Sequence, residues 1–397
     1  MNLSERFPLG SQITLDELDH DPYPAYRLLR ADEPVSWCAV TGMYLITRHQ
    51  DVRAVLLDTE NYIAGTDHSL ILDTFGEHML TTEGAQHDSY KKPLMPLFRP
   101  LAVKERLEAA IGLHVDSLIA GFRDQGEADL RAAFASRLPI LSMLSLFGLP
   151  TSEEHLLRDW YNAFEKALSN FTWDESVRAE AREKVSEFHD YLQVQLDAKR
   201  AAPDDSLFSQ MLACEEPAPL SDEEIRRNAS IIFFGGISTV EALILNSLYV
   251  LTERENLVDR LKEQPSDLIR FLDEVVRWSG PVQSATRHVT KPVELDGVEF
   301  QPGDTVNCML AAANHDPEVF PDPERFDMDR PNLRTHVGFA VGPHHCLGSH
   351  LAKLEASIAL NGLLASLPHL RRSADSEPKI VGYEFRQPKA LHLCWDA

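Results

Sequence analysis

The chain has few cysteines, no excess of positive charge and no export signal. Its five cysteines are far apart in 397 residues and form no Cys-x-x-Cys pair, which argues against a disulfide framework or a cysteine-rich zinc site. The formal net charge of −24 repels nucleic acids and anionic membranes. The first residues, MNLSERFPLG, contain neither a basic segment nor an apolar run. We therefore expect a protein of the reducing cytoplasm, without nucleic-acid or membrane partners.

One apolar run, at positions 229–251, is long enough to span a membrane. It contains Glu241 and Asn246 and has no basic flank. A helix that is apolar nearly all round is also what the centre of a large domain requires. We interpret the run as a buried helix of a globular protein.

The rest of the chain indicates one large, mostly helical domain with a minor β portion, spanning residues 1–397. From about position 100 to 275, apolar residues recur at spacings of three and four, which is typical of helices. From about 280 to 335 the pattern alternates and contains Asp-Gly and Pro-Gly turns, which favours short strands followed by a proline-rich meander. A helical pattern returns after Cys346, and no repeat or low-complexity linker divides the chain.

A lone thiol lies in the segment VGFAVGPHHCLG, positions 337–348. The neighbouring histidines fit no common zinc spacing, and a nucleophilic role needs partners that the sequence does not identify. A buried structural cysteine is a further alternative. Gly342 and Pro343 favour a tight loop before Cys346, and a helix is expected directly after it. A helix N-terminus stabilises a thiolate, so this environment suits an axial metal ligand.

The segment resembles the haem-binding signature of the cytochrome P450 monooxygenases, Phe-x-x-Gly-x-(Arg or His)-x-Cys-x-Gly. The matching residues are Phe339, Gly342, His344, Cys346 and Gly348. The resemblance implies a single-domain, mostly α fold with the shape of a triangular prism. It implies haem b between a long central helix and the cysteine loop, with Cys346 as the iron ligand. At the position after Phe339 the family often has glycine and this chain has alanine, which we take as a minor change.

Other segments resemble the parts of the family that hold the haem propionates. His87 and Lys91, four residues apart, stand where the family has His-x-x-x-Arg, with lysine replacing arginine. Lysine offers a point charge in place of a bidentate fork. Arg287 and His344 resemble the remaining anchors. Two carboxylates facing four cationic or donor groups make a favourable arrangement.

Three further residues resemble the structural ion-pair network of the family. Glu274 and Arg277 lie on one helix face in a Glu-x-x-Arg pattern, and PERF at 323–326 supplies Arg325 as the third member. The resemblance implies that this network holds the meander over the proximal side of the haem.

The long apolar helix carries the residues expected at the oxygen site. Gly235 and Gly236 lie in its middle, where glycine costs about 1 kcal/mol against alanine, so we expect a kink that makes room for dioxygen. Thr239 stands at the hydroxyl position of the family. The preceding position usually carries an acid that relays protons, and here it is Ser238. Glu241 lies two residues further on and is expected to face elsewhere.

The resemblance implies an enzyme that inserts one oxygen atom of O2 into a C–H bond, by hydroxylation or O-demethylation. Electrons would come from NAD(P)H through a reductase and a ferredoxin or flavodoxin-type partner, and the protein is expected to be a bacterial monomer. The substrate would be a small to medium aromatic or terpenoid molecule. The residues expected around it are Ile71, Leu72, Phe75, Ile231, Phe234, Gly235, Val282, Gln283 and Phe385.

Two alternatives use the same haem. A peroxygenase driven by hydrogen peroxide is favoured only by Ser238 in place of the usual acid. A binding or sensor protein without turnover belongs to another class, and the paired glycines and Thr239 argue against it, because a sensor needs no proton-delivering hydroxyl.

Overall fold

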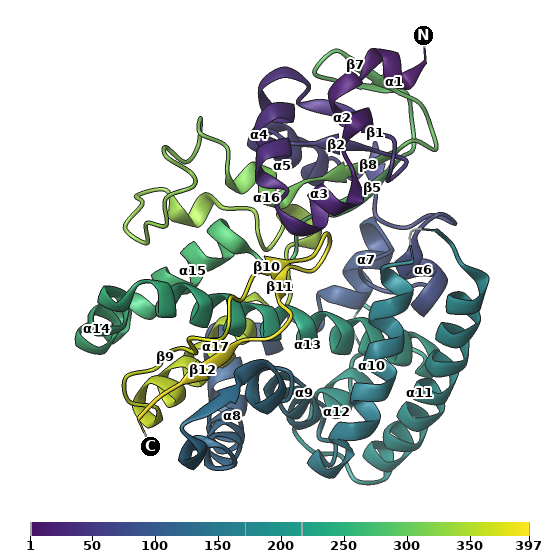
Figure 1. Ribbon diagram of the computed structural model, residues 1–397. Helices are drawn as coiled ribbons and strands as arrows, with labels where there is room; N and C mark the ends of the chain where they lie inside the picture. Colours follow the sequence, from purple (N-terminus) through teal and green to yellow (C-terminus); the bar gives the residue numbers. More distant parts are fainter. Residues whose placement is uncertain (1, 171, 216, 397) are drawn as a thin grey trace.

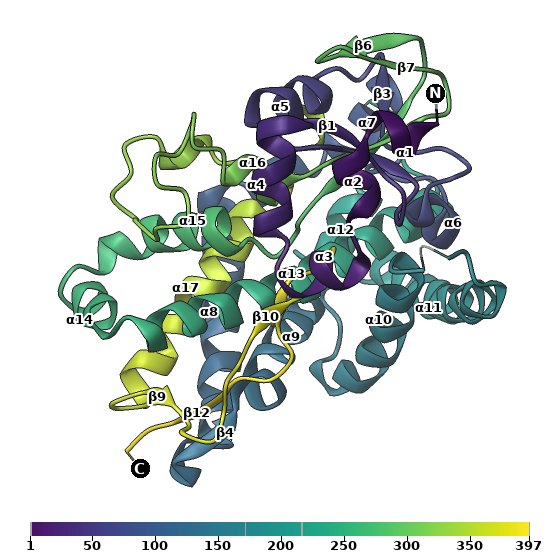
Figure 2. The same cartoon turned by 45° about the horizontal axis from the view of Figure 1, so that its top comes forward.

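Helix α13 (Asp222–Glu253) runs through the middle of the molecule in both views of the computed structural model (Figures 1 and 2). The structure describes residues 2–170, 172–215 and 217–396. A capping box begins the helix, since the Ser221 hydroxyl accepts from the Glu224 amide and the Glu224 carboxylate accepts from the Ser221 amide, at 3.3 and 2.8 Å. By length and composition α13 could cross a membrane, but 78% of its most apolar window is buried inside the protein. The buried-helix interpretation of the apolar run is confirmed.

The other long helices pack around α13. Helices α9, α15 and α17 contact it directly, and α17 packs against α8 on its other side. A Cβ atom at Gly236 would lie 2.6 Å from Met143 Sδ of α9, so glycine permits the close approach of these two helices. The helices of this part are α6 (Leu70–Phe75), α7 (Gly84–Lys91), α8 (Pro100–Ala120), α9 (Leu138–Phe147), α10 (Glu154–Leu168), α11 (Glu175–Ala201), α12 (Leu207–Leu212), α14 (Glu255–Glu263), α15 (Leu268–Ser279) and α17 (Ser349–Ser366).

A five-stranded sheet and the short N-terminal helices form the upper part of the molecule in Figure 1. The strand order is β1-β2-β8-β5-β3, with β2 and β8 parallel and the other neighbours antiparallel. The sheet strands are β1 (Val35–Cys38), β2 (Met43–Ile46), β3 (Tyr62–Ile63), β5 (Ala285–Val289) and β8 (Thr305–Cys308). The helices beside it are α1 (Leu3–Arg6), α2 (Pro8–Gln12), α3 (Leu15–His20), α4 (Tyr23–Asp32), α5 (His49–Leu57) and α16 (Leu310–Asn314).

The remaining strands are short, and among them β4 and β12 join distant parts of the chain. They are β4 (Glu127–Asp129), β6 (Val293–Leu295), β7 (Val298–Phe300), β9 (Arg371–Arg372), β10 (Ile380–Val381), β11 (Gln387–Pro388) and β12 (His392–Cys394). The predicted strands between 280 and 335 are confirmed. Strand β4 was missed in the stretch predicted as helical, because it exists through its pairing with β12, about 260 residues away. Local periodicity does not report such a contact.

A proline-rich meander, residues 315–341, connects α16 to the loop that carries Cys346. No strand occurs in this described segment. A buried cluster on α15 holds it in place. The Arg277 guanidinium donates two hydrogen bonds of 2.7 Å to the Glu274 carboxylate, and both side chains are fully buried. Arg277 also donates to the carbonyls of Asn314 and Pro323, and the Asp327 amide donates to Glu274 at 2.7 Å.

The third member of this cluster is Arg330, which corrects the assignment of Arg325. The Arg330 side chain is 6% exposed, lies 3.4 Å from Glu274 Oε1 and donates to the Arg325 carbonyl at 2.7 Å. The Arg325 side chain is 71% exposed and pairs only weakly with Asp327. Arg325 therefore contributes its backbone carbonyl, whereas Arg330 contributes its charge.

We predict that Glu274→Ala lowers the free energy of unfolding by about 3–5 kcal/mol, because it leaves two buried guanidinium groups without their anion. Arg330→Ala is expected to lower the free energy of unfolding by at least about 1 kcal/mol, because it removes the hydrogen-bond donors to the carbonyls of the meander. Arg325→Ala, the matched control, should stay within about 0.5 kcal/mol of the parent protein. Urea unfolding measures all three. A loss for Arg325→Ala equal to that for Arg330→Ala would contradict the assignment.

Candidate functional site

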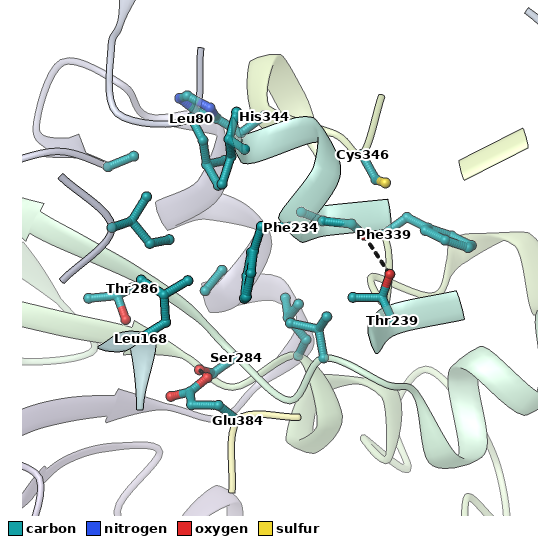
Figure 3. Close-up of a pocket in the computed structure, with 18 of the residues that line it drawn as sticks. Leu80, Leu168, Phe234, Thr239, Ser284, Thr286, Phe339, His344, Cys346 and Glu384 are labelled. Atoms are coloured by element: carbon teal, nitrogen blue, oxygen red, sulfur yellow. Dashed lines mark hydrogen bonds between the residues drawn. The ribbon is translucent and has the colours of Figure 1, made fainter. Parts of the chain in front are cut away.

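An internal cavity of about 580 Å³ lies between α13 and the loop that carries Cys346. Helices α6 and α7, strand β5 and the turn before β11 complete its wall. Most of the side chains that line it are apolar, and Figure 3 draws 18 of the lining residues. The cavity is thus built by segments from both ends of the chain.

The cysteine loop presents its thiol to this cavity. The Cys346 amide donates to the Phe339 carbonyl at 2.9 Å, which closes the loop, and α17 begins at Ser349. Burial raises the pKa of the Cys346 thiol, while the Gly348 N–H and the ammonium groups of Lys91 and Lys353 lower it. Phe339 and Gly348 also line the cavity. The expected helix N-terminus behind the thiol is confirmed.

Ala340, the residue after Phe339, has a strained backbone conformation that the sequence did not indicate. Ala340 has a φ of 54°, in the left-handed region that favours glycine. Its amide donates to the Val337 carbonyl at 2.8 Å, so the turn fixes this conformation. The departure at this position therefore stores backbone strain directly beside the cavity.

Two buried donors on the cavity wall have no partner. His87 is 4% exposed and its Nε2 atom makes no hydrogen bond, and Arg287 is 4% exposed with an unpaired Nε atom. Arg287 otherwise donates only to the Thr286 carbonyl next to it. Unpaired buried donors are costly, so these atoms suit anionic or acceptor groups of a molecule held in the cavity.

The other two expected anchors already have protein partners. His344 Nε2 lies 2.9 Å from a Glu83 carboxylate oxygen, and its ring contacts the His87 ring at 4.7 Å between centroids. The Lys91 ammonium donates to the carbonyls of Pro343 and His345, the latter at 2.7 Å. Lys91 therefore ties α7 to the cysteine loop, and His344 ties the loop to the start of α7. Both residues line the cavity.

Across the cavity from the loop, α13 offers Gly235 and Thr239. A Cβ atom at Gly235 would meet nothing within 4 Å, so this glycine opens onto free space. The Thr239 hydroxyl donates to the Gly235 carbonyl at 2.6 Å, the dashed contact in Figure 3. Helix α13 is continuous over this stretch, and the two glycines have separate roles. Gly235 makes room in the cavity, and Gly236 makes room for Met143.

Comparison with known proteins agrees with this geometry. The family model "Cytochrome P450" matches residues 34–382. The chain belongs to the cytochrome P450 family. It is 32% identical to the cytochrome P450 monooxygenase PikC of Streptomyces venezuelae, over 94% of this chain and 91% of that protein. It is 31% identical to the vitamin D(3) 25-hydroxylase of Pseudonocardia autotrophica, over 88% and 87% of the two chains.

Solved P450 structures have the same fold. CYP109E1 from Bacillus megaterium in complex with testosterone matches with a TM-score of 0.86 at 26% identity, covering 97% of this chain and all of that one. CalO2 matches with a TM-score of 0.85 at 28% identity, covering 95% and 96%. The fold prediction, mostly α with a minor β portion in one P450 domain, is confirmed.

P450 membership implies haem, and the residues of this cavity fit it. A thiol faces the space from the cysteine loop, and Gly235 leaves the opposite wall open. The unpaired Nε2 of His87 and Nε of Arg287 provide donors for two carboxylates. A flat, apolar group that carries two propionates would satisfy these orphaned atoms.

The structure places the Ser238 side chain away from the oxygen site at which it was expected. Its side chain is 2% exposed and does not line the cavity. It faces the Tyr161 hydroxyl of α10, without a hydrogen bond of normal geometry. One residue along a helix turns by about 100°, so Thr239 and Ser238 point to different neighbours. Glu241 also faces away from the cavity, as predicted, and pairs with Arg131 at 2.7 Å.

Six of the nine residues expected around the substrate line the cavity: Ile71, Ile231, Phe234, Gly235, Val282 and Phe385. The other three do not. Phe75 packs behind the wall, edge-on against Phe164. The side-chain amide of Gln283 donates to the Gly280 carbonyl, and the residue is fully buried. Leu72 follows the capped start of α6 and stays outside the lining.

The wall also contains polar residues that sequence reasoning did not select, among them Ser284, Thr286, Glu355 and Glu384. They follow no motif, since each is a single polar residue in an otherwise ordinary segment. Their neighbours Gln283 and Phe385 were selected, so the correct segments were known but not the side-chain directions. For an irregular segment the direction depends on tertiary contacts.

Glu355 of α17 is a buried carboxyl without a hydrogen-bond partner for either oxygen. Burial raises its pKa to about 8, an effect that the nearby Ser142 hydroxyl only partly offsets. At neutral pH this side chain is therefore mainly the neutral acid. A neutral carboxyl is far less costly to bury than its anion.

We predict that Ala340→Gly raises the free energy of unfolding by about 0.5–1 kcal/mol. Releasing the left-handed strain gains about 1–2 kcal/mol, and the extra freedom of glycine in the unfolded chain offsets part of it. Ala179→Gly on the exposed face of α11 is the matched control and should lose about 1 kcal/mol. Thermal unfolding compares the two. A loss of stability in both variants would show that Ala340 is unstrained.

We predict that Glu355 makes stability depend on pH. Because its folded-state pKa lies above its ordinary value, its contribution is complete below about pH 4.5 and is lost as the pH rises through about 8. Relative to Glu355→Gln, the parent protein should lose on the order of 3 kcal/mol between pH 5 and pH 8. Urea unfolding at several pH values checks this, with Glu299→Gln on exposed β7 as the control. Parallel curves for all three proteins would refute the raised pKa.

Proposed function

We propose that this P450 binds haem b through Cys346 and inserts one oxygen atom of O2 into a C–H bond of an apolar substrate. The observation that carries the proposal is the thiol on one wall of an internal cavity, facing Gly235 and Thr239 on the other. When bound, haem supplies the oxygen-activating chemistry of the family. We assign the whole chain, residues 1–397, to this one domain.

The residues of the chain would divide the work in the following way. His87 and Arg287 would hold the two propionates through their unpaired nitrogen atoms. Lys91 and His344 would support the loop from behind, because each already binds a protein partner. The Thr239 hydroxyl donates to Gly235 and keeps its lone pairs free to accept a hydrogen bond in the cavity.

The two alternative functions have little support. Use of hydrogen peroxide was favoured only by Ser238, and that side chain lies outside the cavity. A sensor without turnover would not need the open Gly235 wall and the Thr239 hydroxyl beside it. The monooxygenase reaction therefore accounts best for the site.

The apolar wall supports a small to medium aromatic or terpenoid substrate, with hydroxylation or O-demethylation as the outcome. The vitamin D(3) 25-hydroxylase and the testosterone complex of CYP109E1 show that related proteins accept apolar polycyclic molecules. Hydroxylation of such a molecule is the simplest reaction that this cavity would allow.

Electrons would come from NAD(P)H through a reductase and a ferredoxin or flavodoxin-type protein. Exposed basic residues near the start of α8, namely Lys92, Arg99 and Lys104, could receive an acidic partner. Two of them already have acidic neighbours, Asp88 for Lys92 and Glu108 for Lys104, which reduces the positive charge that the patch offers to a partner. We further propose that the protein acts as a monomer in the cytoplasm.

We predict that the ferrous carbon monoxide complex has the strongly red-shifted Soret band of a thiolate-ligated haem. Cys346→His should lose this band because imidazole replaces the thiolate. Cys394→Ser is the control, because Cys394 lies in β12 and does not line the cavity. Retention of the band in Cys346→His would refute the assignment.

The same preparations test turnover. With NADH, a ferredoxin and its reductase, the wild-type holoprotein should consume NADH in a substrate-dependent way and form an oxygenated product. A protein that binds apolar ligands and haem but never forms product would favour the sensor instead.

A further inference from the structure

Glu384 and Ser284 form a polar pair on the otherwise apolar wall. The Ser284 hydroxyl donates to Glu384 Oε2 at 2.7 Å. The backbone brings the two together. The backbone N–H of Gln283 donates to the Glu384 carbonyl, and Val282 pairs with Phe385 as an isolated β-bridge. Both residues line the cavity. The pair therefore has a fixed position relative to the site.

This carboxyl is held without a counter-ion. In the described part of the chain no lysine or arginine forms an ion pair with Glu384. Burial raises the pKa of the Glu384 carboxyl above its ordinary value, and the hydrogen bonds from Ser284 and Asn307 offset this only in part. The nearest donors orient the carboxyl but bring no positive charge. A buried carboxylate of this kind gains most from a cation.

The exposed part of Glu384 belongs to the cavity. The residue is neither fully buried nor surface-exposed, and it is desolvated by the protein around it. In Figure 3 the pair lies far from Cys346, with Phe234 between them in the view. The wall near the pair is mostly apolar and includes Leu168, with Thr286 beside it in Figure 3. A ligand can therefore have one end on the Cys346 side of the cavity and the other end at Glu384.

We propose that Glu384 and Ser284 recognise a basic nitrogen on the substrate and hold that end of the molecule away from Cys346. The inference rests on the proposed function, since it names the class of substrate for the same site. A protonated amine would supply the missing counter-ion, and the net charge of −24 favours the approach of cations. The carbon skeleton would fill the apolar space, which leaves a C–H bond for oxidation near Thr239.

The test uses a matched pair of probes on the haem-loaded protein. N,N-dimethyl-4-phenylbutylamine carries a basic nitrogen, and (5-methylhexyl)benzene is its carbon isostere. The shift of the Soret band on titration gives a Kd for each probe. We expect wild type to bind the amine at least about tenfold more tightly than the isostere, because hydrogen bonds to charged groups are worth about 1.5–3 kcal/mol.

Glu384→Gln should reduce this preference about tenfold and leave the Kd of the isostere unchanged. Glu299→Gln, which removes one charge on exposed β7, should keep the wild-type ratio. Ser284→Ala is a second variant, which removes the hydrogen bond to the Glu384 carboxyl and should also reduce the preference for the amine over the isostere. It keeps the inference testable if Glu384→Gln does not retain haem.

Equal Kd values for the two probes in wild type would overturn the inference, and so would an unchanged ratio in Ser284→Ala and Glu384→Gln. A spectrum of nitrogen–iron ligation by the amine would also overturn it, because the nitrogen would then lie at Cys346's end. The carbon monoxide band separates this result from the proposed function. Its presence in every protein keeps the monooxygenase assignment intact, and its absence from wild type would overturn both.

Discussion

The buried pair of Glu274 and Arg277 is the interaction on which the site depends. It joins α15 to backbone carbonyls of the meander, and Arg330 adds a second guanidinium from the meander itself. The described segment it holds contains no strand and only local turns, so these charged hydrogen bonds are what fix it to α15. Because the meander leads directly into the cysteine loop, the direction of the Cys346 thiol follows from a salt bridge some seventy residues earlier in the chain.

Few charged side chains line the cavity, and they differ in how their charge is compensated. Lys91 and His344 are satisfied by the protein, the nitrogen atoms of His87 and Arg287 are left for a ligand, and Glu355 avoids its charge by staying protonated. Glu384 differs from Glu355 in that the Ser284 and Asn307 side chains donate to it, although burial raises its pKa as well. In an apolar cavity these differences in compensation have large energetic effects, because a low dielectric screens charges poorly.

The sequence predicted the fold and the cysteine side of the site well, because these depend on dense local motifs and long periodic helices. It failed where direction matters more than position. Arg325 and Arg330 lie five residues apart in one proline-rich stretch, and only the folded path shows which side chain turns inward. Ser238 and Thr239 are neighbours on one helix with different surroundings. Ala340 looked harmless until its φ was known, and Glu384 carried no pattern that could have distinguished it.

The burial of α13 also has a consequence for how the protein is made. During synthesis this apolar helix leaves the ribosome before α15 and α17, which cover part of it in the finished fold. Among the helices made earlier, α9, α10 and α11 contact it. The nascent chain must therefore carry a segment as apolar as a membrane span until its C-terminal third is complete. Chaperone capacity and translation speed over this interval should limit the yield of soluble protein more strongly than the stability of the finished fold does.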